Sequence, residues 1–123
     1  MKSLLILSMI LIFSNCEINE IVRQQNKVDE LWEELVRLSE SESCTNSGEW
    51  RAAPIGNKAC GGPAGYLPYS VNIDTTYFLD LARQHREASS ELNRLTGAFS
   101  TCDVVPLPDK IECKDGKAEL IYN

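Results

Sequence analysis

The stretch DTTYFLDLARQHREASSELNRLTG, residues 74–97, carries the clearest structural signal in the chain. Its apolar residues recur in steps of three and four, which is typical of a helix with one buried face. Asp74 can accept hydrogen bonds from the free amides of a first turn, and Gly97 can take the left-handed conformation that ends a helix. We therefore expect a helix over 74–96. Its apolar face consists of Phe78, Leu81, Ala82, Ala88, Leu92 and Leu95.

Short extended segments are expected just before this helix. Residues 49–55 are predicted as a strand whose Pro54 must lie at an edge or a turn. Residues 56–65 contain four glycines and a proline, which excludes a regular helix or strand interior. Residues 66–71 are aromatic and partly alternating, and we expect them to be extended.

A hairpin is expected after the helix, beyond a proline-punctuated connector at 104–108. Residues 110–113 and 117–122 alternate in polarity on either side of Asp115-Gly116. Asp-Gly between alternating segments favours a two-residue hairpin turn. The C-terminal residues therefore predict two antiparallel strands.

A second helix is expected at the other end, over residues 18 to about 40, where apolar residues again fall three and four apart. The polar run at 23–27 interrupts the apolar face, so the first turns are expected to form a solvated tether. The predicted fold is α+β, with two helices packed on a small antiparallel sheet that ends in a C-terminal hairpin.

The first fifteen residues resemble an export signal. Lys2 precedes an apolar run over 4–13. That run is shorter than the roughly 20 residues that span a bilayer, but it suits the core of a signal peptide. A buried N-terminal helix is the alternative. The sequence predicts a signal peptide at 1–15, a lipid-anchored helix or tether at 16–42, and a disulfide-stapled domain at 43–123.

Phe13-Ser14-Asn15-Cys16 resembles the lipobox of bacterial lipoproteins, with departures at Phe13 and Asn15. We expect Cys16 to carry a lipid that holds the chain on the bacterial cell envelope, at the outer membrane or the periplasmic face. The alternative is cleavage after Cys16, which would release a secreted protein. In both cases four cysteines remain, and they predict two disulfides with three possible pairings.

Two classes of ligand fit the composition poorly. The formal net charge of −6 disfavours nucleic acid, whose phosphates would be repelled. No Cys-x-x-Cys pair or calcium-loop spacing occurs, so no metal and no cofactor is expected.

A set of short motifs resembles those of small exported bacterial proteins and lipoproteins that have no established activity. The similarity covers residues 43–118. Its motifs are Ser43-Cys44-Thr45, Gly56-x-Lys58-Ala59-Cys60-Gly61-Gly62-Pro63-x-x-Tyr66-x-x-Tyr69-Ser70, Glu91-x-Asn93, Ser100-x-Cys102 and Cys113-x-x-Gly116-Lys117. Members often carry two further cysteines, near positions 50 and 118, which are absent here. The resemblance implies that the first strand lies beside the last, and it favours the pairs Cys44–Cys113 and Cys60–Cys102.

His85 is the single histidine and falls on the apolar side of the helix at 74–96. A general base needs a nucleophile or an acid within reach, and no nucleophile motif accompanies it. We expect His85 to be packed and bonded to backbone, and we predict no catalytic residue. The alternative is a small envelope enzyme that uses His85 with nearby carboxylates.

The glycine-rich segment is the candidate binding site. Its residues are Lys58, Gly61, Gly62, Pro63, Tyr66 and Tyr69. A loop pinned by Cys60 would present a rigid shape with little ordering cost on binding. The alternative is that the glycines only turn the chain while the tyrosines fill the core. The expected function is non-enzymatic binding of an envelope or extracellular protein, for example as an inhibitor. A structural envelope component that assembles through helix 18–40 is a further alternative.

Overall fold

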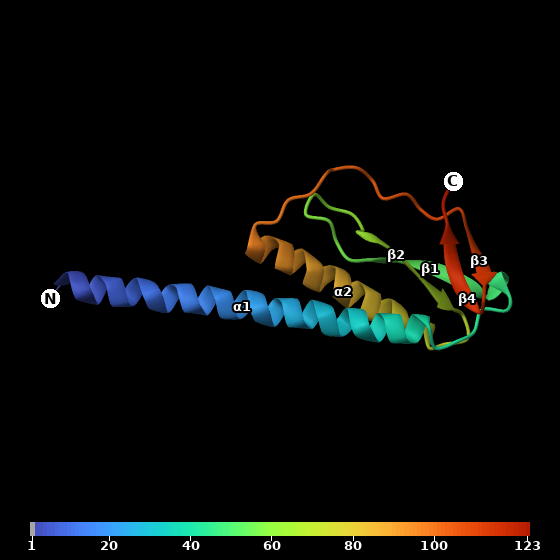
Figure 1. Ribbon diagram of the computed structural model, residues 1–123, viewed down its shortest axis with the longest axis horizontal. Coiled ribbons are helices and arrows are strands. Elements are labelled where there is room, and N and C mark those ends of the chain that lie inside the picture. The colour runs from blue at the N-terminus through green and yellow to red at the C-terminus, as the bar shows by residue number, and fades with distance from the viewer. Residues whose placement is uncertain (1) are drawn as a thin grey trace.

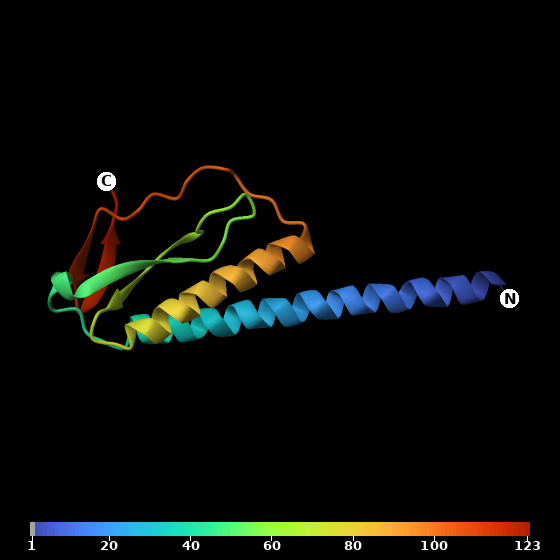
Figure 2. The ribbon, with the colours of Figure 1, turned by 180° about the vertical axis from the view of Figure 1, so that it is seen from behind.

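The computed structural model describes residues 2–123, with side chains from residue 15 onward. The elements follow the order α1 (Lys2–Ser39), a short 3₁₀ turn (Ser47–Glu49), β1 (Trp50–Ile55), β2 (Gly65–Ser70), α2 (Thr75–Thr96), β3 (Lys110–Lys114) and β4 (Lys117–Ile121). The side chains of the expected signal peptide at 1–15 lie, apart from Asn15, outside the described residues. Figures 1 and 2 show the two helices side by side, with the strands gathered at the end where α1 stops.

The helix at 74–96 is confirmed together with both of its ends. The Asp74 carboxylate accepts a hydrogen bond of 3.0 Å from the Tyr77 amide, and Gly97 has a φ of 62°. The amide of Ala98 then bonds the Asn93 carbonyl at 3.1 Å, which closes the last turn. Local capping chemistry therefore sets the limits of α2.

Helix α1 runs antiparallel to α2 and continues through the polar run at 23–27 (Figure 1). The side-chain amide of Gln24 donates to the Ala88 carbonyl at 3.0 Å, so this run already docks on α2. Residues 15–20 are all exposed. The solvated part of the helix that was expected to reach Lys27 is therefore shorter, because Gln24 finds a backbone partner on α2.

The strands form two separate two-stranded sheets, β1–β2 and β3–β4, both antiparallel. Asp115 and Gly116 both have positive φ, 51° and 76°, as the expected two-residue turn requires. β4 contacts β2 without pairing to it. One reason is Pro68 in β2, which has no N–H and whose carbonyl accepts a 2.6 Å hydrogen bond from Ser39 Oγ. Trp50 and Ala118 line one cavity of about 590 Å³, but β4 pairs with β3 and not with β1, the first strand.

Both outer edges of the β1–β2 sheet carry a proline. The Val71 amide bonds the Glu49 carbonyl at 2.8 Å, so residues 49 and 71 form a hydrogen-bonded pair of the antiparallel ladder. Hydrogen-bonded and non-hydrogen-bonded pairs alternate along the ladder, so the backbone groups of Pro54 and Pro68 point away from the partner strand. Arg86 donates to the Pro54 carbonyl at 2.8 Å. The sheet therefore offers little to an incoming strand at either edge.

The core lies between the helix pair and the β1–β2 sheet. Its buried members are Leu35, Ala53, Tyr69, Phe78, Leu81 and Ala82. Tyr69 stacks on Phe78 with ring centroids 4.7 Å apart. Two disulfides, Cys44–Cys113 and Cys60–Cys102, complete the α+β domain and confirm the favoured pairing. The first joins the segment after α1 to the hairpin, and the second joins the glycine loop to the connector after α2.

Candidate functional site

The glycine loop between β1 and β2 is closed by its own backbone. The Lys58 amide donates to the Gly62 carbonyl and the Gly61 amide to the Lys58 carbonyl, both at 2.9 Å. Gly61 and Gly62 have φ values of 104° and 80°, a region that side chains rarely enter. These two glycines are required by the turn itself.

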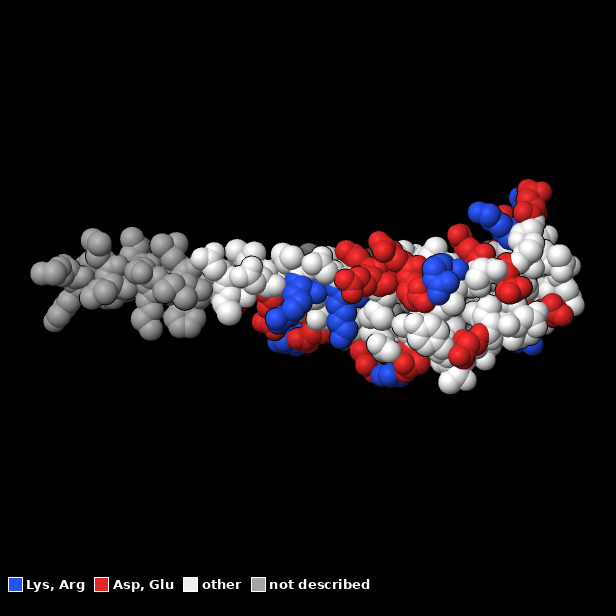
Figure 3. Space-filling model, turned by 90° about the horizontal axis from the view of Figure 1, so that it is seen from below, with Lys and Arg blue, Asp and Glu red and all other residues white. Residues whose placement is uncertain are grey.

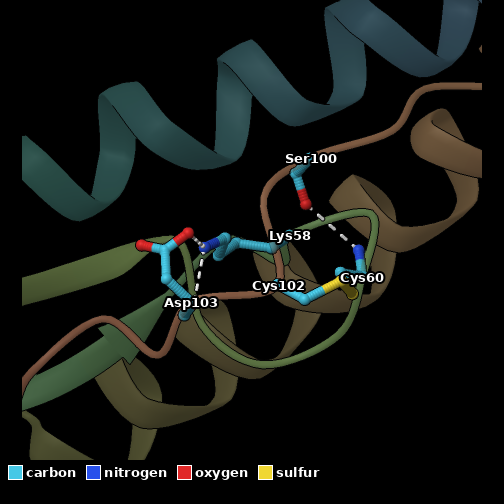
Figure 4. Close-up of a disulfide and its surroundings, with 5 residues drawn as sticks. All are labelled: Lys58, Cys60, Ser100, Cys102 and Asp103. Atoms are coloured by element: carbon cyan, nitrogen blue, oxygen red, sulfur yellow. Dashed lines mark hydrogen bonds and ion pairs between the residues drawn. A yellow bond between two sulfur atoms is a disulfide. The ribbon is translucent and has the colours of Figure 1, made fainter.

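Three further ties fasten this loop to the connector, as Figure 4 shows. Besides the Cys60–Cys102 disulfide, the Cys60 amide donates to Ser100 Oγ at 3.2 Å. Lys58 Nζ donates to the backbone carbonyl and to the carboxylate of Asp103, at 2.6 and 3.2 Å. Hydrogen bonds from Thr101 and then from Lys58 hold the pKa of Asp103 below its ordinary value. The loop and the connector therefore form one cross-linked unit.

The base of the loop is fixed to α2, while its tip is open. Asn93 donates to the Asn57 carbonyl at 2.8 Å, and the Gly56 amide donates to His85 Nδ1 at 3.1 Å. A Cβ at Gly56 would meet the Ala64 Cβ at 2.9 Å, so the base is tightly packed. No atom lies within 4 Å of a Cβ built at Gly61 or Gly62. The tip is held firmly and faces solvent.

The structure brings together only part of the predicted site. Lys58, Gly61, Gly62 and Pro63 share the loop, but the ammonium of Lys58 is bound to Asp103 and its side chain is only 13 % exposed. The two tyrosines lie in β2, half-buried at Tyr66 and in the core at Tyr69. Residues three apart on a strand point to opposite faces, so both rings cannot join one surface.

Sequence reasoning missed the apolar side chains of the connector. Phe99, Val104 and Leu107 are 95, 88 and 71 % exposed. The sequence predicts only a proline-punctuated link at 104–108 and no role for Phe99. Its lack of helical or alternating apolar periodicity is the one signal that these residues have no place in the core.

His85 is buried, and its ring lies 5.8 Å from that of Trp32, centroid to centroid. Because Nδ1 accepts the Gly56 amide, we assign the ring proton to Nε2. Burial first, and then the charge of Arg86, lower the pKa of His85 below its ordinary 6.5. Within residues 15–123 no carboxylate hydrogen-bonds to this ring. The expected packed histidine, bonded to backbone, is confirmed.

The lowered pKa makes stability depend on pH. The unfolded chain binds the proton of His85 more tightly than the folded chain does. The stability that the neutral, buried imidazole contributes is therefore complete above pH 6.5 and is lost as pH falls toward the folded pKa. We expect His85→Leu to lower the free energy of unfolding by about 1–3 kcal/mol at pH 8, because the buried Gly56 amide loses its acceptor. The deficit relative to the parent should shrink by pH 5.5. Urea titrations at both pH values measure it, with His85→Gln, which keeps an acceptor, as the milder control. A deficit that does not change with pH would contradict the assignment.

No protein family, curated protein or solved structure matches the chain. Over the described residues, no helix has the length and apolar character needed to cross a membrane. Nor does this part of the chain hold three or more His, Cys, Asp or Glu side chains arranged to bind a metal ion. The two disulfides indicate an oxidising compartment outside the cytoplasm.

Proposed function

We propose that the chain is an exported bacterial envelope lipoprotein, anchored through Cys16, whose domain binds another protein without catalysis. The binding surface is the loop over 57–64 together with the connector to which it is cross-linked. The observation that supports this most directly is the contrast within the loop. Its base and flanks are fixed by a disulfide and several hydrogen bonds, while its tip faces open solvent.

Such a contrast suits recognition. A loop that is already ordered loses little conformational entropy when a partner binds, so more of the contact energy appears as affinity. Folding alone does not require an open tip, because the Gly56 end of the loop already packs against Ala64 and His85. The tip is free to contact a partner.

The position of Cys16 suits an anchor. Its thiol is free and exposed on α1. Gln24, the residue that bonds α2, lies eight positions later, so a rise of 1.5 Å per residue places the domain about 12 Å beyond the anchor. This spacing leaves room between the domain and a lipid attached to Cys16.

Site-specific crosslinking in cells tests the binding surface. A photoreactive residue in place of Ala59, which is exposed in the loop, should yield a discrete adduct with a second protein. The same residue in place of Glu33, exposed on α1, serves as the matched control and should yield none. The proposal fails if position 59 gives no adduct, or if both positions give the same one.

A further inference from the structure

The connector over 98–109 has no helix or strand and follows the outside of the molecule between α2 and β3 (Figures 1 and 2). Its side chains divide into two sets. Ser100, Cys102 and Asp103 are tied to the glycine loop. Phe99 and Val104, which flank them, are 95 and 88 % exposed. Phe99 therefore projects into solvent between two fixed points, the Ala98 amide that bonds the Asn93 carbonyl and the Ser100 hydroxyl that accepts from the Cys60 amide.

Most backbone groups of this connector also lack a backbone partner, although the Asp103 carbonyl accepts a 2.6 Å hydrogen bond from Lys58 Nζ. The Ala98 amide bonds Asn93 and the Asp109 amide bonds the Ile121 carbonyl at 2.8 Å, but no amide from 99 to 108 donates to a backbone carbonyl. A segment that is anchored at several points and has few backbone hydrogen bonds of its own can pair with a partner by strand addition. The prolines at both edges of the β1–β2 sheet make that sheet a poor substitute.

We propose that residues 98–104 dock as an added strand in the substrate groove of an endopeptidase, with Phe99 filling an apolar primary pocket. This rests on the proposed function and names its partner class. Endopeptidase grooves bind extended peptides through main-chain hydrogen bonds and read side chains in pockets. Pro106 and Pro108 end the segment that can pair. The ties at 98, 100 and 102 hold both flanks of Phe99 in place.

A protein groove suits these residues better than a lipid surface does. Hydrocarbon cannot satisfy amides that have no backbone partner, such as those of residues 99–102, whereas a groove lined by backbone can. The connector contains Asp103 and Asp109 and no Lys or Arg, so an anionic membrane would repel it. The exposed Phe99 has the chemistry of a binding hot spot, an aromatic anchor that inserts into a pocket.

Inhibition assays with the full-length exported protein test this proposal. The probe is chymotrypsin, whose primary pocket is apolar, acting on a chromogenic peptide. We expect competitive inhibition, which Phe99→Ala should weaken by at least about 30-fold, the loss expected for a hot spot. Leu107→Ala is the matched control, since Leu107 is exposed but lies beyond Pro106, and it should stay within about 3-fold of the parent. Trypsin should not be inhibited through this segment, because 97–109 offers no Lys or Arg.

Several results would overturn the proposal. They are the absence of chymotrypsin inhibition, inhibition that Phe99→Ala leaves intact, and rapid cleavage after Phe99 in the oxidised protein. Binding to phosphatidylglycerol–phosphatidylcholine vesicles that depends on Phe99, without inhibition, would replace the endopeptidase by a membrane. If adducts still form from position 59 in any of these cases, only the endopeptidase assignment falls and the proposed protein-binding function stands.

Discussion

Replacing Cys44 and Cys113 together by serine is expected to lower the free energy of unfolding by about 4 kcal/mol. The bond joins residues 69 apart in sequence, so its loss gives the unfolded chain a large gain in conformational freedom. Cys44 is only 3 % exposed, and a serine there would leave a buried hydroxyl. Small domains have a total stability of about 5–15 kcal/mol, so this variant should unfold at much lower urea concentration.

Urea titration at pH 7 measures this effect, and Cys60→Ser with Cys102→Ser provides the comparison. That bond spans 42 residues, so its loss should release similar chain entropy. Both of its cysteines are exposed, so no hydroxyl is buried. The Cys44 and Cys113 variant should therefore be the less stable of the two. If the Cys44 and Cys113 variant lost less than about 1 kcal/mol of unfolding free energy, the Cys44–Cys113 bond would not restrict the unfolded chain as its sequence separation predicts.

Phe78→Ala is expected to destabilise the domain by about 3–5 kcal/mol. Phe78 has no exposed surface and stacks on Tyr69, at the centre of the core between the helices and the β1–β2 sheet. Its removal loses the transfer free energy of the ring and leaves a cavity that the neighbouring backbone cannot fill.

Phe99→Ala is the control for this prediction, because it deletes the same ring from a position that is 95 % exposed. Its cost should stay within about 0.5 kcal/mol. Thermal or urea unfolding of the two variants measures the difference. Equal losses would mean that Phe99 also packs in the core, and that the connector is not the open surface on which the proposed partner docks.

Features that depend on local chemistry could be predicted from the sequence. The limits of α2 follow from an Asp74 carboxylate that accepts an amide hydrogen bond and from a glycine with positive φ. The C-terminal hairpin follows from Asp115 and Gly116, whose φ values suit a two-residue turn. The packed state of His85 follows from its place on the apolar face of the same helix.

Features that depend on how distant segments meet could not be predicted. The sequence suggested one sheet. In the structure Ser39 donates a hydrogen bond to the Pro68 carbonyl at the edge of β2, and the strands of the C-terminal hairpin pair only with each other. The sequence left two places open for Tyr69, the binding site and the core, and only the packing of β2 on the helices shows that it fills the core. The polar run at 23–27 gave no sign that Gln24 would find the Ala88 carbonyl. The exposed connector was missed because the conformation of Phe99 depends on ties to a loop some forty residues earlier.

Figure 3 shows acidic and basic side chains interspersed along the described part of the helices, with acidic groups in excess. Several charges of the two helices are paired within one helix, as in Arg83 with Asp80 and with Glu87, both at 2.7 Å. Exposed pairs of this kind add little to stability. The helical surface therefore offers charges, several of them paired, together with single apolar residues such as Ile18 and Leu79. The most exposed apolar side chains, those of Phe99 and Val104, lie on the connector.

Export, lipid anchoring and the two disulfides are tested together by the mass of the protein recovered from the cell envelope. The mass is measured after thiol alkylation, with and without prior reduction. We predict a chain that begins at Cys16 with an added lipid mass and takes up four alkyl groups only after reduction, at Cys44, Cys60, Cys102 and Cys113. A chain that still begins at Met1 and is alkylated at every cysteine without reduction would contradict export, the cross-linked loop and the partner together.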